Sequence, residues 1–466
     1  MHIRLTSRGW GGVLPLLTAL TLLASACAQQ QAQAPAAAPT TAPAAAPTTA
    51  PAAAPTTAAA APTKPPAAAA TTAPAAAATT APAAAPTTAA AAGATPAAGG
   101  AALSGEIQFA WAGPLTGDVA QLGQGYLNGI QMAADEWNAK GGLLGKKIVI
   151  KPEDDACDPK QASAVAQKIA DDPKNVLLFG HFCSGTTLAG GPIENKVNLP
   201  QITISSNPKI TQQGWKNLFR PVANDNIQGA AGVLTVMKKV GAKKFALLND
   251  KQAFGQGVTE VAKATIEKNG GTVTSFGGVE PKDVDYSGTL TPIIQVQQPD
   301  AIVYCTNFNT SAGLMVKQIR QLGFKGPIIG CDGYFDPGMI KAAGDAAECK
   351  SDSECVYVTF QVPPYDQDGP PAVQDFAKKY KAKFGNDPNG YEIYGYDYAN
   401  LAFNAVKKAG SEDHQKVIDA LRAGGVPGVL LPDYSFDENG DIKNPALYIY
   451  KILGGKFKLI EQYKGS

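Results

Sequence analysis

Three side chains with reactive atoms lie close together in the segment LFGHFCSGTT, residues 178–187. His181, Cys183 and Ser184 are residue types that form nucleophile–base pairs, because an imidazole can take the proton of a thiol or a hydroxyl. Cysteine and histidine are also common zinc ligands. The segment therefore raises three possibilities: a catalytic nucleophile, a metal site, or a group of residues that does no chemistry.

The rest of the chain supplies few partners for these groups. The chain has three histidines, and the other two are His2, near the N-terminus, and His414, in a polar segment with helical pattern. No second histidine completes a metal set, and no G-x-S-x-G elbow surrounds Ser184. Neither a P-loop nor a complete G-x-G-x-x-G pattern occurs. We therefore expect no catalytic residue, metal or cofactor, and interpret His181 as a hydrogen-bonded residue at a strand end.

The N-terminal part of the chain has the composition of a targeting segment followed by a spacer. Residues 1–26 carry two arginines, an apolar stretch and small residues before Cys27, the layout of a secretory signal. The end ASAC resembles a bacterial lipobox, so we expect a lipid on Cys27, with ordinary cleavage nearby as the alternative. Residues 27–103 are almost wholly Ala, Pro, Thr and Gln, a composition that cannot bury a core. We expect a disordered tether.

Composition also restricts the partners of the remaining chain. The chain has 40 Lys and Arg against 39 Asp and Glu, a formal net charge of +1, which gives no basic surplus for nucleic acid. No stretch after Cys27 approaches the roughly 18 uninterrupted apolar residues typical of a membrane span. We therefore expect a soluble domain that is held at the membrane by a lipid anchor.

Short apolar runs alternate with segments of helical periodicity from Ser104 onward. The expected strands are IQFAWAG, KIVIKPED, VLLFG, LPQITIS, FALLND, AIVYC, GPIIGC and CVYVTF. The expected helices are residues 125–140, 159–171, 226–240, 255–269, 287–297, 310–322 and 373–384. This alternation predicts parallel sheets covered on both faces by helices. Because roughly 360 residues exceed one comfortable core, we expect two α/β lobes.

Most of the unusual residues follow a predicted strand. The segments concerned are AGPLTGD, HFCSG, SSNP, DKQAFGQG, TNFNTS and CDGYFD. Ligands of open parallel sheets bind at the carboxyl ends of the strands. Two lobes that face each other would place all these loops around one cleft. Gly123 and Gly125 are expected to let the start of a helix approach an anionic group of the ligand.

The motif EDDACDPKQASAVAQKIADD, residues 153–172, together with GHFCS, resembles the leucine/isoleucine/valine-binding proteins of bacterial ABC transporters. Further matches follow in order: TQQGWKNLFRPV, DKQAFGQG, IRQLGFKG, AAGDAAE and VPPYDQ. The resemblance covers nearly everything from about residue 105. It implies a type I periplasmic-binding fold, with two doubly wound parallel-sheet lobes joined by three crossovers.

The resemblance also implies how the chain is divided. The first lobe takes about residues 104–221 and 360–435. The second lobe takes about residues 222–359 and 436–466. The ligand is expected between them.

Cysteine pairing is open from the sequence positions alone, because the six cysteines after Cys27 allow fifteen connectivities. The family pattern implies a disulfide between Cys157 and Cys183, which makes Cys183 a structural staple beside the site. Outside that pattern, two further pairs are near in sequence or at neighbouring strand ends, and we expect both to form. These pairs are Cys349 with Cys355 and Cys305 with Cys331.

The resemblance implies a ligand set as well. A ligand carboxylate would be held by Ser184 and Ser206, with help from groups around Ser205, and a ligand ammonium by Asp332. The walls would include Phe254 and Phe308, where relatives often have tyrosine, and Leu122, where some have an aromatic residue. Ordinary lobe packing is the alternative for the two phenylalanines.

The expected function is an extracytoplasmic, lipid-anchored receptor on the outer face of the cytoplasmic membrane, in the periplasm or cell envelope. It would capture a branched-chain or related aliphatic or aromatic amino acid and deliver it to an ABC permease and its ATPase. A second hypothesis is a sensing receptor for amides or carboxylates without transport. A third is an enzyme on two α/β lobes, for which His181 is the candidate base.

Overall fold

A computed structural model describes residues 103–366 and 368–464, all within one compact unit of the chain. The expectations for the signal peptide, for a lipid on Cys27 and for the tether up to residue 102 fall outside these residues. Within the described part of the chain, no helix is both long and apolar enough to cross a bilayer.

The helices and strands alternate along most of the chain. The strands are β1 (Glu106–Gly113), β2 (Lys147–Asp154), β3 (Asn175–Phe179), β4 (Gln201–Ile202), β5 (Leu218–Phe219), β6 (Lys244–Asn249), β7 (Thr272–Gly278), β8 (Ala301–Cys305), β9 (Ile328–Gly330), β10 (Val356–Phe360), β11 (Leu447–Leu453) and β12 (Lys456–Tyr463). The helices are α1 (Ala120–Ala139), α2 (Pro159–Ala170), α3 (Ser184–Lys196), α4 (Asp225–Val240), α5 (Ala253–Lys268), α6 (Ser287–Pro292), α7 (Asn309–Gln321), α8 (Pro337–Ala343), α9 (Pro371–Phe384), α10 (Tyr391–Ala409) and α11 (His414–Arg422).

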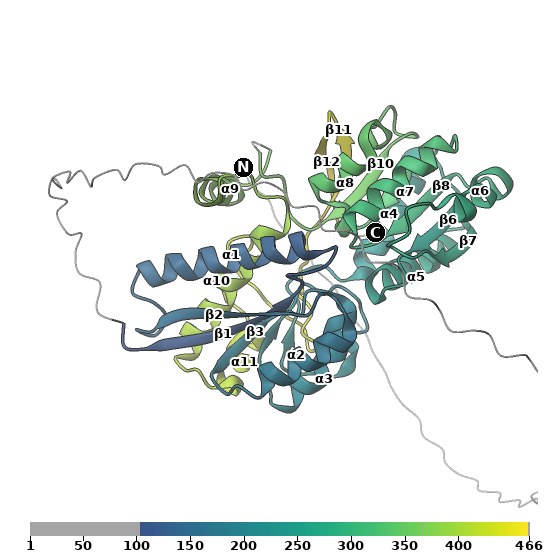
Figure 1. Cartoon of the computed structure of the whole chain (residues 1–466). Coiled ribbons are helices and arrows are strands. Elements are labelled where there is room, and N and C mark those ends of the chain that lie inside the picture. Colours follow the sequence, from purple (N-terminus) through teal and green to yellow (C-terminus); the bar gives the residue numbers. More distant parts are fainter. Residues whose placement is uncertain (1–102, 367, 465–466) are drawn as a thin grey trace, which may run out of the picture. The chain divides into compact units, whose positions relative to one another are not determined.

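The first sheet is parallel, with strand order β2-β1-β3-β4-β5. Helices α1 and α10 lie on one face and α2 and α3 on the other (Figure 1). Residues alternate along β1 accordingly: Phe109 packs edge-on against Phe403 of α10, with ring centroids 5.0 Å apart, while Ala110 packs in a cluster with Val165 of α2. This is the period-2 pattern of a strand that is buried on both faces.

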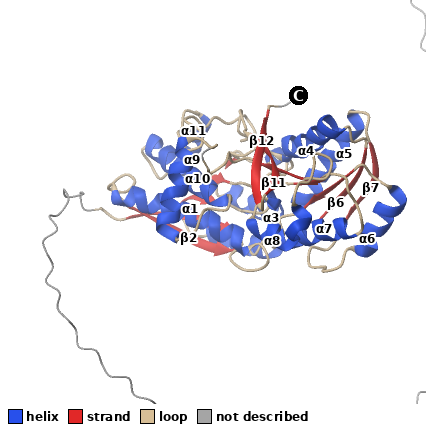
Figure 2. Ribbon diagram, turned by 90° about the horizontal axis from the view of Figure 1, so that it is seen from above, coloured by secondary structure: helices blue, strands red, loops and turns tan. Residues whose placement is uncertain are grey.

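The second sheet has strand order β12-β11-β10-β9-β8-β6-β7. Strands β6 to β10 are parallel to one another, and β11 and β12 are added to β10 as antiparallel strands. Helices α4 and α5 cover one face, and α6 and α7 the other (Figure 2). The expected fold class, two doubly wound α/β lobes, is therefore confirmed.

The described chain passes between the lobes three times. The passages follow β5, follow β10 and precede β11. The third passage lies later than the expected start of the second lobe at residue 436. Phe436 packs on Phe219, with ring centroids 5.1 Å apart, and Asp441 accepts a hydrogen bond from Arg220 Nε at 2.6 Å. We propose that the first lobe extends to about residue 442.

Two helices that position the site were not expected from the pattern. Helix α3 contains three glycines and Pro192, which obscure its periodicity. Helix α10 has buried residues around most of its circumference, so it lacks the polar face of an amphipathic helix. Both depend on tertiary packing rather than on local propensity.

The expectation for Gly123 and Gly125 was wrong. A Cβ atom at Gly123 would lie 1.9 Å from the carbonyl oxygen of Pro114, and one at Gly125 would lie 2.9 Å from Glu392 Oε1. These glycines therefore allow α1 to pack closely against neighbouring protein groups. They do not open the helix toward a ligand.

Candidate ligand-binding site between the lobes

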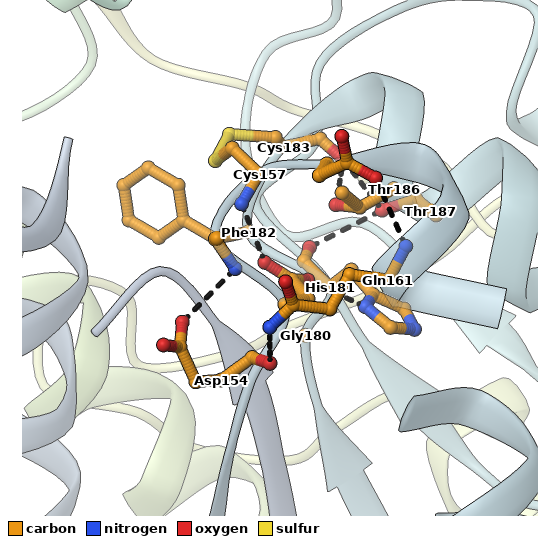
Figure 3. Close-up of polar contacts among 12 residues, drawn as sticks. Asp154, Cys157, Gln161, Gly180, His181, Phe182, Cys183, Thr186 and Thr187 are labelled. Atoms are coloured by element: carbon orange, nitrogen blue, oxygen red, sulfur yellow. Dashed lines mark hydrogen bonds and ion pairs between the residues drawn. A yellow bond between two sulfur atoms is a disulfide. The ribbon is translucent and has the colours of Figure 1, made fainter. Parts of the chain in front are cut away.

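The segment LFGHFCSGTT runs from the end of β3 into the first turn of α3. Cys183 precedes the helix and forms a disulfide with Cys157, with Cα atoms 5.5 Å apart (Figure 3). Its sulfur therefore carries no free thiol. Cys183 therefore cannot be the thiol nucleophile of the enzyme hypothesis.

His181 is buried between two carboxylates. Its Nδ1 lies 2.7 Å from Asp155 Oδ2 and its Nε2 lies 2.9 Å from Glu194 Oε1, and all three side chains are 0% exposed. Burial alone would lower the pKa of His181, but the charge of Glu194 and the hydrogen bond to Asp155 raise it to about 10. With both ring nitrogens occupied, His181 has no position from which to act as a base.

The main chain at His181 organises the neighbouring loops. Its carbonyl oxygen accepts hydrogen bonds from Thr203 Oγ1 at 2.8 Å and from Ser205 Oγ at 3.0 Å. The Ser205 hydroxyl also contacts Thr187 Oγ1 at 2.6 Å. These contacts join the end of β3 to the loop after β4, so the two loops form one rigid rim.

Arg220 supports the same rim from the interior. Its guanidinium is 0% exposed and donates from Nη1 to the carbonyl oxygens of Ser205 at 3.1 Å and Asn207 at 2.7 Å. The charge is paired with Asp441, as a buried cation requires. The motif FRPV thus supplies a supporting residue that the sequence reading did not single out.

Five of the residues implied by the resemblance line one cavity between the lobes. They are Ser184, Ser205 and Ser206 from the first lobe, and Phe254 and Asp332 from the second. The lobes also touch beside it, because Asn207 Nδ2 donates to the carbonyl oxygen of Ala253 at 2.6 Å. The cavity volume is about 20 Å³.

Asp332 lies at the second-lobe side of this cavity and is 8% exposed. Its backbone N–H donates to Gln228 Oε1 at 2.8 Å, and its Oδ2 accepts from Gln361 Nε2 at 3.3 Å. Burial raises the pKa of Asp332 to about 6. Burial and then the charge of Asp332 raise the pKa of the nearby Asp225 to about 7. The cavity therefore has an acidic end.

Two of the expected wall residues lie elsewhere. Leu122, in the first turn of α1, packs into the main hydrophobic core. Phe308 precedes α7 and lines a separate depression with Asp118 and residues 281–284. Neither residue belongs to the lining of the cavity that contains Ser184.

Four lining residues were missed: Phe182, Ile204, Asn307 and Tyr391. The first three are sequence neighbours of residues that were named. Tyr391 comes from α10, far along the chain, and its ring packs against that of Phe182 at 5.4 Å between centroids. The spacing of Tyr391, Tyr394 and Tyr398 places three tyrosines on one side of a helix. This spacing is visible in the sequence and could have indicated that α10 contributes to the site.

Two other disulfides occur within the described residues. Cys305 and Cys331 have Cα atoms 5.3 Å apart, and this pair joins the ends of β8 and β9 immediately before Asp332. Cys349 and Cys355 have Cα atoms 4.2 Å apart and close the short KSDSE loop. The first of these fixes the strand ends that carry Asn307 and Asp332.

The sequence of the described part matches a family as a whole. A sequence model of the periplasmic binding protein family covers residues 106–456. This chain belongs to that family. The match spans both lobes and all three passages between them, so it includes every residue of the cavity lining.

Relatives of this periplasmic binding protein identify its branch. A leucine-, isoleucine-, valine-, threonine- and alanine-binding protein from Pseudomonas aeruginosa is 33% identical over 347 residues, which are 74% of this chain and 89% of that protein. A crystal structure of a leucine-binding protein from Thermotoga maritima has a TM-score of 0.69 at 27% identity and covers 76% of this chain and 98% of that one.

A branched-chain amino acid transporter substrate-binding protein from Streptococcus pneumoniae, in complex with isoleucine, has a TM-score of 0.67 at 25% identity and covers 76% of this chain and 99% of that one. These matches confirm the branched-chain amino acid ABC substrate-binding family and its type I fold. The named relatives are solute-binding proteins rather than enzymes.

Proposed function

We propose that this periplasmic binding protein captures an aliphatic α-amino acid between its lobes and delivers it to an ABC permease. The observation that carries the proposal is the pairing of a helix N-terminus and Ser184 on one lobe with Asp332 on the other, around one cavity. An α-amino acid carries the two charges that fit these two ends.

The first-lobe end suits a carboxylate. Ser184 is the first residue of the 13-residue helix α3, whose N-terminal backbone N–H groups favour an anion. The Ser184 hydroxyl accepts a hydrogen bond from Asn207 N–H at 3.3 Å, so its own proton remains available to donate to a ligand. Hydrogen bonds to a charged group contribute about 1.5–3 kcal/mol each.

The second-lobe end suits an ammonium, and the walls suit an aliphatic side chain. Asp332 supplies the opposite charge at the acidic end of the cavity. Phe254, Phe182, Ile204 and Tyr391 supply apolar surface from both lobes. A branched aliphatic side chain would bury its area against these groups, at roughly 25 cal/mol per Å².

Ligand capture requires the lobes to move. A volume of about 20 Å³ is little more than the roughly 10–15 Å³ that one water needs, so an amino acid enters only when the lobes separate. A ligand that contacts Ser184 and Asp332 together binds the closed form better than the open form. Such differential affinity shifts the population toward closure.

Calorimetry with three matched ligands tests the proposal. Leucine carries both charges, 4-methylpentanoate lacks the amine, and isoamylamine lacks the carboxylate. We expect leucine to bind at least about 30-fold more tightly than either analogue, because each analogue leaves one end of the cavity unpaired. Equal or tighter binding of 4-methylpentanoate would contradict the amino acid assignment and favour the alternative, a receptor for carboxylates or amides.

Transport and sensing are separated by a second measurement. We propose transport because the chain belongs to a family of ABC substrate-binding proteins. Addition of the leucine-loaded protein to reconstituted permease and ATPase should stimulate leucine uptake. Failure to stimulate uptake, despite tight leucine binding, would favour a sensing receptor.

We propose further that the protein works in the periplasm or cell envelope, anchored by a lipid on Cys27. The support is the family and the ASAC sequence after an apolar N-terminal stretch. We expect Cys27→Ser to release the protein from the membrane fraction, with loss of the lipid mass from the mature chain. A variant that remains membrane-bound would contradict the anchor.

A further inference from the structure

A second cavity lies at the hinge, and its volume is about 90 Å³. All three passages between the lobes contribute to its wall: residues 221–223, Gln361 with Pro363, and Ala446 with Tyr448. Helices α9 and α10 and residues 429–431 and 434 complete it. Among the described residues, none lines both this cavity and the one between Ser184 and Asp332.

Three of the four tyrosine hydroxyls in this wall already have hydrogen-bond partners, and the fourth belongs to Tyr448. The hydroxyls of Tyr394, Tyr398 and Tyr434 donate to Gln361 Oε1 at 2.8 Å, to the carbonyl oxygen of Pro221 at 3.2 Å and to a carboxylate oxygen of Asp397, respectively. Prolines at three wall positions have no backbone N–H to offer. A charged or strongly polar occupant would therefore lose its hydration and find few partners in return, since the Tyr448 hydroxyl is the one tyrosine hydroxyl of the described wall without a hydrogen-bond partner.

The apolar groups in the wall favour an aromatic occupant. Valine, leucine and isoleucine side chains line the cavity beside the tyrosine rings. Tyr394 and Tyr398 stack with ring centroids 5.6 Å apart, and Tyr398 packs edge-on against Tyr434 at 6.2 Å. An aromatic occupant could pack against these rings in the same stacked or edge-on arrangements. A volume of 90 Å³ is several times the roughly 10–15 Å³ that one water needs, but it is smaller than the apolar cavity of about 150 Å³ that binds benzene, so the occupant is limited to about one aromatic ring.

The cavity is linked to the cleft through one side chain. Gln361 accepts from the Tyr394 hydroxyl and donates to Asp332 Oδ2, so it lies between the hinge wall and the acidic end of the cleft. In the proposed function the lobes close by rotating about the three passages that form the wall, and such closure would change the shape of the cavity. An occupant that prefers one shape must change the affinity of the cleft by the same factor.

We propose that the hinge cavity is a second ligand site, which takes a small neutral aromatic molecule. Occupancy of this site changes the affinity of the cleft for its amino acid. The second statement rests on the proposed function, whereas the first does not.

Toluene is the probe for the test, with methyl-labelled full-length protein in solution. We expect intermolecular nuclear Overhauser effects from toluene to the methyl groups of Leu430, Leu431 and Ile442, which line the cavity. Ala446→Leu adds three carbons to the wall and should weaken toluene binding at least tenfold. Ala409→Leu is the matched control, because Ala409 is also partly buried but lies outside the wall.

Each outcome decides part of the proposal. Absence of these Overhauser effects in toluene-saturated buffer, or equal toluene binding by Ala446→Leu and the control, would overturn the site. We expect saturating toluene to change leucine affinity at least threefold in the native protein, and an unchanged affinity would overturn the coupling. If leucine does not bind while the Overhauser effects persist, the proposed function and the coupling fail and the hinge site stands.

Discussion

Replacing His181 by glutamine is expected to lower the free energy of unfolding by about 3–5 kcal/mol, the cost of breaking a buried ion pair by removing one partner. The substitution leaves Asp155 and Glu194 at 0% exposure without the imidazolium that lies 2.7 and 2.9 Å from them. One of the two carboxylates must then take up a proton or draw in water. Denaturant unfolding at pH 7 measures the difference.

His414→Gln is the matched control for this variant. His414 has both ring nitrogens near backbone carbonyl oxygens, at 3.3 and 2.8 Å, and no carboxylate partner among the described residues. We expect this substitution to cost less than about 1 kcal/mol. Similar losses for both variants would contradict an ion-pair role for His181.

The pKa of His181 determines the pH range in which this residue stabilises the folded protein. Its pKa is about 10 in the folded protein and about 6.5 in the unfolded chain. The folded state therefore binds the proton more tightly, and the stabilisation is fully present below about pH 6.5. It is lost as the pH rises through about 10. The stability difference between the native protein and His181→Gln should shrink across that interval.

Replacing Asp332 by asparagine is expected to weaken leucine binding by roughly 30-fold to several thousand-fold. The substitution removes the negative charge that would pair with the ligand ammonium, and truncating one partner of a buried hydrogen-bonded charge pair costs about 2–5 kcal/mol. Asparagine keeps nearly the same shape, so packing in the cleft is preserved. Calorimetry at pH 7.5 measures the loss.

The ligand series provides the control for this prediction. Binding of 4-methylpentanoate does not depend on the negative charge of Asp332, so its affinity should stay unchanged or increase in Asp332→Asn. Equal weakening of leucine and 4-methylpentanoate would indicate a general disturbance of the cleft. Unchanged leucine affinity would remove Asp332 from the site.

The raised pKa of Asp332 also predicts how leucine affinity varies with pH. Burial raises its pKa to about 6, and its charge contributes to raising that of Asp225 to about 7. An ammonium pairs with the ionised carboxylate, so leucine binding should weaken as the pH falls below about 6, approaching tenfold per unit. Asp332→Asn should flatten this dependence. A native protein with constant affinity between pH 5 and 7.5 would contradict the pairing.

Much of the cleft could be predicted because parallel strands bring their carboxyl ends to one edge of a sheet. Ser184, Ser206 and Asp332 each follow an apolar run, and the family resemblance implies roles for them in ligand binding, which stay predictions. Leu122 and Phe308 lie in comparable segments but do not line the cavity. A loop position alone does not fix the direction of a side chain, because helical phase and neighbouring contacts decide it.

The sequence by itself determined the two-lobe α/β class, since short apolar runs and helical periodicity are local signals that survive without tertiary information. Only the tertiary structure showed that His181 is a buried ion-pair partner. Asp155 and Glu194 come from different segments of the chain, and their charges act strongly on His181 because all three side chains are buried together. Tyr391 and the hinge cavity depend likewise on α10, which is buried on most sides and so carries little amphipathic signal. Periodicity can be read from neighbouring residues in the sequence. Packing between segments that are far apart in the sequence cannot.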